Sequence, residues 1–91
     1  MEEALRYLLV GTCGGENRAR IIRVLSDRPH NANRLADRLD TDYNTVRYHL
    51  DTLVGHDIVE AGEHDYGKPY FLTDRFEHHC GAFERLTDRM D

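Results

Sequence analysis

The fold is decided by residues 42–55, DYNTVRYHLDTLVG. Four apolar residues in this stretch have the spacing i, i+4, i+7 and i+8, which aligns them along one side of an α-helix. They are Val46, Leu50, Leu53 and Val54. Asp42 can cap the helix because its carboxylate accepts hydrogen bonds from the unpaired N–H groups of the first turn, and Gly55 is a typical helix end. The stretch therefore predicts an amphipathic helix from Tyr43 to about Gly55 with a polar outer face.

A shorter helix is predicted immediately before it, from Ala32 to Leu39. Asn31 is a suitable N-cap for this helix, and its apolar residues fall on one face. They are Leu35, Ala36 and Leu39. Residues 40–42, Asp-Thr-Asp, are too polar and turn-prone to continue it. A short helix, a turn and a second helix with a polar outer face form a helix-turn-helix pattern.

The neighbouring sequence extends this pattern into a small domain. An amphipathic helix is predicted for Glu16–Asp27, and it ends before Pro29 because the residue preceding a proline avoids helical geometry. Two β-prone runs, 58–61 and 68–73, are separated by a turn that contains Gly and Asp, which predicts a hairpin. Pro69 cannot donate to a ladder, so we expect its strand at the edge of the sheet. The hairpin makes the helix-turn-helix a winged one.

Helices are also predicted at both ends of the chain, over Met1–Val10 and Asp74–Met90, with a glycine-rich linker after the first. Thr73 can cap the last helix, whose apolar residues follow a 4-3-4-3 spacing. They are Phe76, Cys80, Phe83, Thr87 and Met90. We therefore expect a single domain over 1–91, mostly α with a small β-hairpin and the order α-α-α-α-β-β-α. Its parts are an N-terminal helix at 1–10, a winged-helix core at 16–73 and a C-terminal helix at 74–90.

The apolar faces of the two terminal helices have no partner in a three-helix winged core. A protein this small also benefits from a partner chain, because it buries only about 60% of its unfolded surface. We therefore expect a homodimer in which the N- and C-terminal helices pack together across a two-fold axis.

The charge distribution points to a polyanion as partner. The chain has 17 acidic and 12 basic residues, a formal net charge of −5, and one Lys among the basic residues. Such a composition is typical of proteins from salt-in halophiles, because it keeps a surface hydrated in concentrated salt; a GC-rich genome is the alternative explanation. Residues 17–50 nevertheless hold seven Arg and four Asp, a net of +3. A basic segment inside an acidic chain is suited to nucleic acid.

Double-stranded DNA is the expected partner, and the helix after Asp42 carries the candidate contacts. Asn44 can pair with an adenine edge and Arg47 with a guanine edge. The other candidates on this helix would contact sugars, thymine methyls or phosphates; they are Asp42, Tyr43, Thr45 and Tyr48. A wing at about 62–68 would touch the flanking backbone through His64 and Lys68. The alternative for each of these side chains is a solvated surface residue, and for His49 we expect a packed position at the edge of the apolar stripe.

Five segments between residues 16 and 73 also carry a family resemblance. They are NRARIIRVL at 17–25, LA at 35–36, DYNTVRYHLDTL at 42–53, DIVE at 57–60 and YGKPYFLT at 66–73. Together they resemble archaeal winged helix-turn-helix transcription regulators of the ArsR-like class, and the composition favours a haloarchaeal member. The resemblance implies a dimeric regulator with the helix 43–51 in the major groove and a wing tip near 64–68 on the flanking backbone or minor groove. The metal-sensing Cys-x-Cys of that class is absent from residues 42–53, so metal sensing is not implied.

Other classes of function find little support in the sequence. No Ser/His/Asp grouping, paired carboxylates or cofactor loop is present, so we expect neither an enzyme nor a cofactor. His78, His79 and Cys80 cannot converge on one ion because adjacent helical residues point about 100° apart; with Asp74 they could form only half of a metal site shared across a dimer. No apolar run reaches membrane-spanning length and no signal peptide is recognised, so we expect a cytoplasmic protein. The alternative function is a winged-helix protein-interaction module of the transcription machinery that does not contact DNA.

Overall fold

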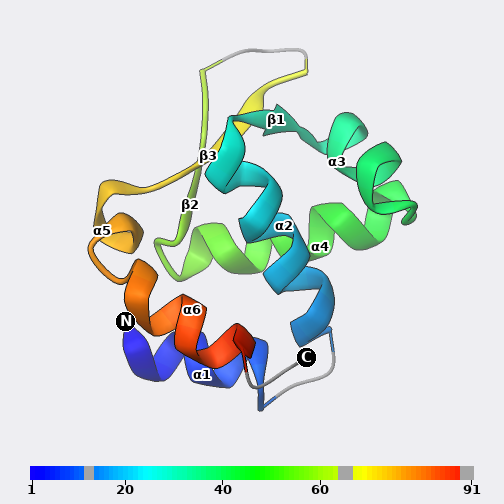
Figure 1. Ribbon diagram of the computed structural model, residues 1–91. Helices are drawn as coiled ribbons and strands as arrows, with labels where there is room; N and C mark the ends of the chain where they lie inside the picture. Colours follow the sequence, from blue (N-terminus) through cyan, green and yellow to red (C-terminus); the bar gives the residue numbers. More distant parts are fainter. Residues whose placement is uncertain (12–13, 64–66, 89–91) are drawn as a thin grey trace.

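The helices pack together on one side of a small antiparallel sheet, which lies at the top of the view in Figure 1. The computed structural model describes residues 1–11, 14–63 and 67–88. Within these residues the elements follow in the order α1 (Glu2–Leu9), α2 (Gly15–Asp27), β1 (His30–Asn31), α3 (Ala32–Leu39), α4 (Tyr43–Gly55), β2 (Val59–Ala61), β3 (Pro69–Leu72), α5 (Asp74–Glu77) and α6 (Cys80–Asp88). The mostly helical prediction with a small hairpin is confirmed.

Helices α3 and α4 form the predicted helix-turn-helix, and both predicted caps are present. The Asn31 side chain accepts a hydrogen bond from the Arg34 N–H at 2.8 Å, and the Asp42 carboxylate accepts one from the Thr45 N–H at 2.9 Å. Asp40 ends α3 with φ 52°, a left-handed conformation that Asp tolerates better than most residues. The β2–β3 hairpin follows α4, so the winged helix-turn-helix arrangement predicted from the sequence is confirmed.

The buried face of α4 differs from the prediction at its C-terminal end. Val46, Leu50 and Leu53 are at most 1% exposed, as expected. Val54 was predicted in the same stripe, but it is 40% exposed, whereas His49 is 5% exposed. The prediction for Val54 was wrong because the buried face of α4 is centred nearer to His49 than the spacing predicted. The His49 ring lies beside Gly14 at the start of α2.

The sheet has the strand order β1-β3-β2, with antiparallel pairing throughout. The strand of Pro69 is therefore central, and the prediction of an edge strand was wrong. Pro69 is tolerated because it is the first residue of β3 and its missing N–H lies at the end of the ladder. Its carbonyl still accepts a hydrogen bond from the Gly62 N–H at 2.7 Å. The partner strand β1 has two residues, too short to show an alternating pattern in the sequence.

The single C-terminal helix predicted for 74–90 is interrupted. α5 ends at Glu77, α6 begins at Cys80, and the predicted last residues 89–90 lie outside the described residues. Thr73 caps α5 as predicted, accepting a hydrogen bond from the Phe76 N–H at 3.0 Å. The His79 N–H donates to the Phe76 carbonyl at 2.7 Å, a tight turn that redirects the chain. Because of this turn Cys80 is exposed, so its predicted place as a filler of the apolar stripe was wrong.

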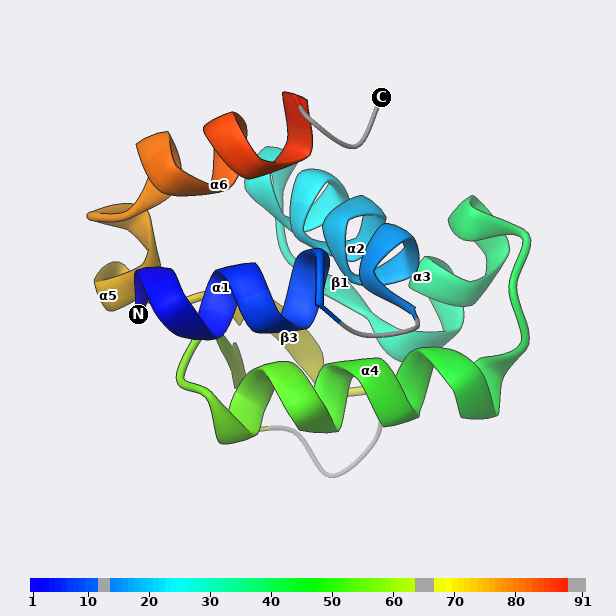
Figure 2. The ribbon, with the colours of Figure 1, turned by 90° about the horizontal axis from the view of Figure 1, so that it is seen from below.

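The two terminal helices cover each other within one chain. Figures 1 and 2 show α6 alongside α1. Leu5 and Phe76 are fully buried, and Phe83, at 6% exposed, stands edge-on to Phe76 with ring centroids 5.8 Å apart. An exposed pair at 3.5 Å, Arg85 with Glu2, spans the same two helices. The premise that these apolar faces lack a partner in the monomer was therefore wrong.

The junction between α1 and α2 is held by close backbone contact. A Cβ on Gly15 would collide with the carbonyl oxygen of Leu9, so α2 can begin against the end of α1 only with glycine at this position. The Arg18 guanidinium donates a buried hydrogen bond to the Leu8 carbonyl at 2.9 Å. α1 is thereby fixed to the helix that also supports α4.

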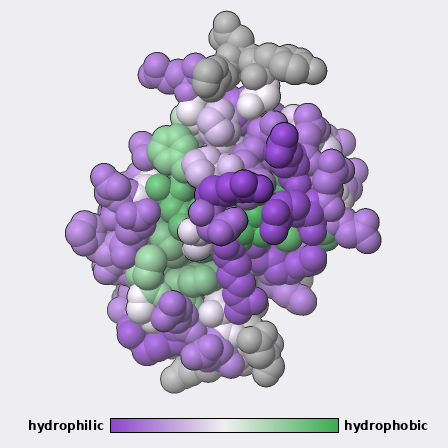
Figure 3. All heavy atoms as spheres, turned by 45° about the horizontal axis from the view of Figure 1, so that its top comes forward, coloured by the Kyte–Doolittle hydropathy of each residue, from purple (hydrophilic) through white to green (hydrophobic). Residues whose placement is uncertain are grey.

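A groove of about 430 Å³ lies between α2 and the α5–α6 segment, lined by Arg23, Phe76, Cys80, Phe83 and Glu84 among others. Figure 3, viewed toward this side of the molecule, shows apolar side chains gathered between hydrophilic flanks.

In Figure 2 α6 and α4 lie on opposite sides of the molecule. In the part of the chain that is described, no helix is long and apolar enough to cross a membrane.

Candidate nucleic-acid interface

The outer face of α4 is open along its length. Asn44 is exposed, and the aromatic side chains of Tyr43 and Tyr48 are 41% and 63% exposed. Side chains exposed on the second helix of a helix-turn-helix are positioned to reach the major groove of a duplex. Three of the residues predicted to contact DNA, Tyr43, Asn44 and Tyr48, are therefore accessible to a duplex.

The inner face of α4 is anchored by packing that includes His49. Its ring lies against Gly14, whose φ of 87° and missing side chain make room for it. Burial lowers the pKa of His49 below its ordinary value, and the positive charge of Arg18 lowers this pKa further. His49 is thus neutral at pH 7, and its Nδ1 is buried without a hydrogen-bond partner among the described atoms. The prediction of a packed His49 is confirmed.

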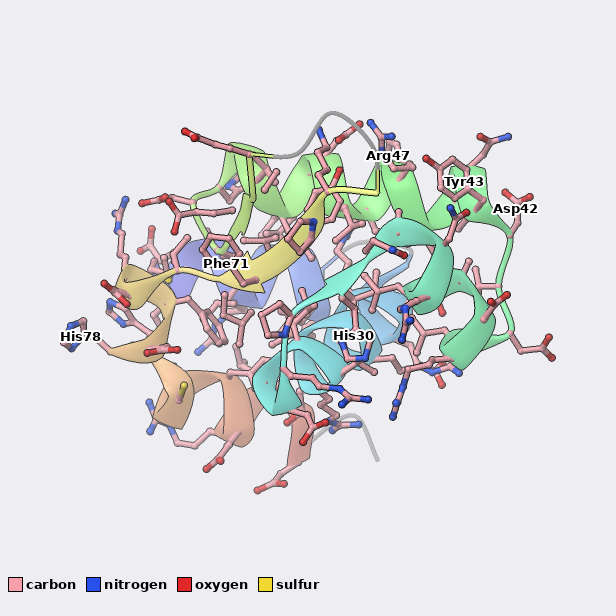
Figure 4. The ribbon with its side chains drawn as sticks, turned by 90° about the horizontal axis from the view of Figure 1, so that it is seen from above. His30, Asp42, Tyr43, Arg47, Phe71 and His78 are labelled. Atoms are coloured by element: carbon pink, nitrogen blue, oxygen red, sulfur yellow. The ribbon has the colours of Figure 1, made fainter. Side chains whose placement is uncertain are left out.

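Arg47 is held in place by residues one turn away on either side. Its guanidinium donates a hydrogen bond to the Tyr43 hydroxyl at 3.2 Å, and a terminal nitrogen lies 4.0 Å from the Asp51 carboxylate. The hydrogen bond to Tyr43 raises the pKa of Arg47, and the electrostatic effect of Tyr70 on β3 raises this pKa further. Arg47 therefore lies on the side of α4 that faces the hairpin, and Figure 4 shows Arg47 and Tyr43 adjacent on the outside of the helix.

Asp42 and Thr45 are engaged with each other at the start of α4. The Asp42 carboxylate accepts hydrogen bonds from both the N–H and the hydroxyl of Thr45, at 2.9 and 3.2 Å. Both bonds organise the first helical turn. The sequence singled out these two residues for the DNA backbone, and the structure gives each of them a capping role.

The wing contributes one described candidate. Lys68 is half-buried, and its ammonium group lies 5.7 Å from the centre of the Tyr70 ring. This distance is within the range of a cation–π contact, which orients the ammonium at the base of the hairpin. The other candidate of the wing, His64, lies outside the described residues.

The basic segment 17–50 does not place all its charge on the interface. Arg18 is 4% exposed and bonded to the Leu8 carbonyl, and Arg20 donates to the carbonyl of Leu39 at 3.1 Å. Both guanidinium groups brace helix ends from within the domain. Counting charges along the sequence therefore overestimates the positive charge that DNA would meet.

Asp51 is a residue of this face to which the sequence analysis gave no role. It is four residues beyond Arg47, the spacing at which oppositely charged side chains meet on a helix. That spacing was visible in the sequence.

At the other end of the molecule His78 and Cys80 are exposed, and the described residues contain no group of three or more His, Cys, Asp or Glu side chains able to hold a metal ion.

Comparisons with known proteins agree with this geometry. A family model described as a helix-turn-helix domain matches residues 16–61, half of the chain, from α2 to β2. No curated protein matches the chain in sequence.

Several solved structures share the fold. RV1404 from Mycobacterium tuberculosis is 18% identical with a TM-score of 0.71, over 98% of this chain and 62% of that one. A MarR transcriptional regulator from Methanosarcina mazei Go1 is 15% identical with a TM-score of 0.73, over 97% and 66%. Diamide-treated YodB from B. subtilis is 23% identical with a TM-score of 0.71, over 97% and 86%. The chain thus spans less than two thirds of the first two structures, and at these identities the similarity is one of fold.

Proposed function

Since the chain belongs to the helix-turn-helix domain family, we propose that it is a sequence-specific DNA-binding transcription regulator. α4 enters the major groove, and the wing at about 62–68 lies on the flanking backbone. The observation that carries the proposal is the open outer face of α4, on which Tyr43 and Tyr48 are 41% and 63% exposed. This accessible face belongs to the second helix of the helix-turn-helix, the helix that enters the major groove in this motif.

The roles of the side chains follow from their chemistry. Asn44 offers a donor and an acceptor to the edge of adenine, and Arg47 offers two donors to guanine. Tyr48 supplies a ring for sugars or a thymine methyl and a hydroxyl for phosphate. Asp42 and Thr45 keep the first turn of α4 in shape, which aims its N–H groups at the backbone. Lys68 and His64 are the proposed backbone contacts of the wing.

The proposal includes a homodimer, as in the ArsR-like regulators that the sequence resembles. The buried faces of α1 and α6 cannot supply the interface, because they cover each other. Support comes from surfaces that stay open: Tyr7 and Val10 are 60% and 56% exposed on and just beyond α1. Sedimentation velocity at tens of micromolar should give a dimer for the native chain and a monomer for Val10→Asp. Val54→Asp, at an exposed site on α4 (40% exposed, against 56% for Val10), is the control and should stay dimeric; a monomeric native chain contradicts the dimer.

The acidic composition bears on the conditions of binding. Phosphate neutralisation weakens steeply with salt, by orders of magnitude for six to ten contacts. The chain has a net charge of −5, and two of its central arginines are engaged in internal hydrogen bonds. Neutralisation of phosphates therefore contributes little to its affinity for DNA. For a protein of a halophilic archaeon, base contacts and the fit of α4 carry the affinity instead. A log–log salt slope as steep as −6 contradicts this part of the proposal.

Selection from a random DNA pool at high KCl tests the function. The native chain should enrich a defined sequence, whereas Asn44→Ala should lose that enrichment. Glu84→Ala on α6, exposed on the side away from α4, is the matched control and should enrich the same sequence as the native chain. If the folded native chain enriches nothing, the protein-interaction module remains and the DNA-binding proposal fails.

A further inference from the structure

Three residues form a ladder along the outer face of α4. Tyr43, Arg47 and Asp51 follow one another at intervals of four residues, so they lie in one line on the helix. The Arg47 guanidinium lies between the other two, 3.2 Å from the Tyr43 hydroxyl and 4.0 Å from the Asp51 carboxylate. The side chain of Arg47 is 38% exposed and that of Asp51 is 67% exposed. The negatively charged residue is thus the more exposed member of the ion pair.

The ladder makes the charge of this helix unusual for a DNA-contacting element. Between Tyr43 and Gly55 Arg47 is the single Arg or Lys, and Asp51 is the single Asp or Glu. The two charges cancel, and Asp42 adds a further carboxylate immediately before the helix. A phosphate group that approaches Arg47 must therefore also approach the Asp51 carboxylate, which lies 4.0 Å from the guanidinium. The phosphate and the carboxylate are both negative and repel each other at this range.

A guanine edge meets a different situation. It is neutral and presents two acceptors side by side, which match the two donors of a guanidinium. Guanine can therefore replace Tyr43 and Asp51 as the partner of Arg47 without bringing a second negative charge to Asp51. Asp51 therefore opposes contact between Arg47 and the phosphate backbone but leaves contact between Arg47 and guanine available.

We infer that Asp51 is a specificity-determining residue, which acts on DNA through Arg47 by opposing its contact with phosphates while permitting its contact with guanine. The inference rests on the proposed DNA-binding function. Asp51 is a positioning residue in this account: its effect appears in the ratio of specific to non-specific binding and in the salt dependence of binding.

Asp51→Asn tests the inference because it removes the charge and keeps the shape. Binding to the selected sequence and to a scrambled duplex is measured over a range of KCl concentrations. Affinity for the scrambled duplex should rise about fivefold, the scale of one exposed charge pair, while affinity for the selected sequence changes by less than about twofold. The slope of log K against log salt on the scrambled duplex should become steeper by about 1, because Arg47 then contacts one more phosphate.

Two control variants separate this effect from general ones. Glu84→Gln removes the same charge from α6, on the opposite side of the molecule, where screening beyond about 10 Å leaves little influence on the DNA. It should leave the ratio and the slope at the native values. Asp88→Asn removes an exposed carboxylate charge at the end of α6 and should likewise leave both quantities at the native values.

The outcomes distinguish the inference from the function beneath it. If the native chain selects a sequence but Asp51→Asn leaves both the ratio and the slope unchanged, the inference fails and the function stands. If Asp51→Asn weakens binding to the selected sequence alone, Asp51 contacts a base directly and the inference is also overturned. If the native chain binds no DNA, both fail together.

Discussion

Replacing Gly15 by alanine should destabilise the protein more than any other single added methyl group at a described glycine. The Cβ would overlap the carbonyl oxygen of Leu9 and lie 2.6 Å from its carbonyl carbon, both of them backbone atoms that cannot rotate away. Relief requires α1 to move off the start of α2, which opens the packing of Leu5 and Leu8. Overpacking of a buried site costs about 1–3 kcal/mol, and partial loss of the α1 contacts takes Gly15→Ala to the upper end of that range.

Gly55→Ala is the matched control. It makes the same chemical change at the last residue of α4, where the added Cβ meets nothing within 4 Å. Alanine should stabilise this position by at most about 0.5–1 kcal/mol, the range for a helix interior, because glycine is the poorer helix former. Urea unfolding followed by circular dichroism measures both variants, and a domain of this size shifts in Tm by about 4–8 °C per kcal/mol. Equal urea midpoints for Gly15→Ala and the native chain would refute the packing of α1 described above.

Three further predictions concern stability. Asp42→Ala should lower the free energy of unfolding by about 1 kcal/mol, because it removes the cap of α4; a urea midpoint equal to that of the native chain would contradict the cap. Arg18→Ala should cost about 1.5–3 kcal/mol, the range for a hydrogen bond to a charged group, whereas the more exposed Arg20→Ala should cost less; the reverse order would be inconsistent with the burial of Arg18. The pKa of His49 is lower in the folded than in the unfolded chain, so the unfolded state takes up a proton first and stability should fall as the pH drops below about 6.5. His49→Gln should reduce this loss between pH 7 and pH 5, as urea midpoints across that interval will reveal; a pH dependence identical to that of the native chain counts against a buried neutral His49.

The helix-turn-helix could be predicted from the sequence because its signals are local. The caps Asn31 and Asp42, the spacing of Val46, Leu50 and Leu53, and the turn between the helices all operate within a few residues. Such interactions depend little on the rest of the fold, and both helices have the predicted bounds.

The errors arose where distant segments meet. Pro69 lies in the central strand because the two-residue β1 pairs with its free side. The paired residues, His30 with Tyr70 and Asn31 with Pro69, are far apart in the sequence, so no local pattern predicts this pairing. The C-terminal apolar stripe looked continuous, yet the turn at His79 divides it, so that Phe76 and Phe83 pack against each other and α6 lies against α1. For the same reason the terminal helices appeared to need a second chain.

In the candidate site, too, local features could be predicted from the sequence and contacts between distant segments could not. That Asn44 and Tyr48 are open on α4 followed from helical spacing alone. The contacts of Arg47 with Tyr43 and Asp51 could have been derived from spacings of four residues. The internal bonds of Arg18 and Arg20 depend instead on where the carbonyl groups of Leu8 and Leu39, near the ends of α1 and α3, lie in the packed domain. Sequence periodicity identifies the exposed residues of a helix, and only the packed structure identifies which charges are already paired.

The central claim is that the outer face of α4 contacts bases, and binding to single-base variants of the selected sequence tests it most directly. Asn44→Ala and Arg47→Ala should each lose about 1–3 kcal/mol of discrimination at one base position and keep the native preference at the others. If both variants discriminate among the base-substituted duplexes as the native chain does, α4 does not read the sequence.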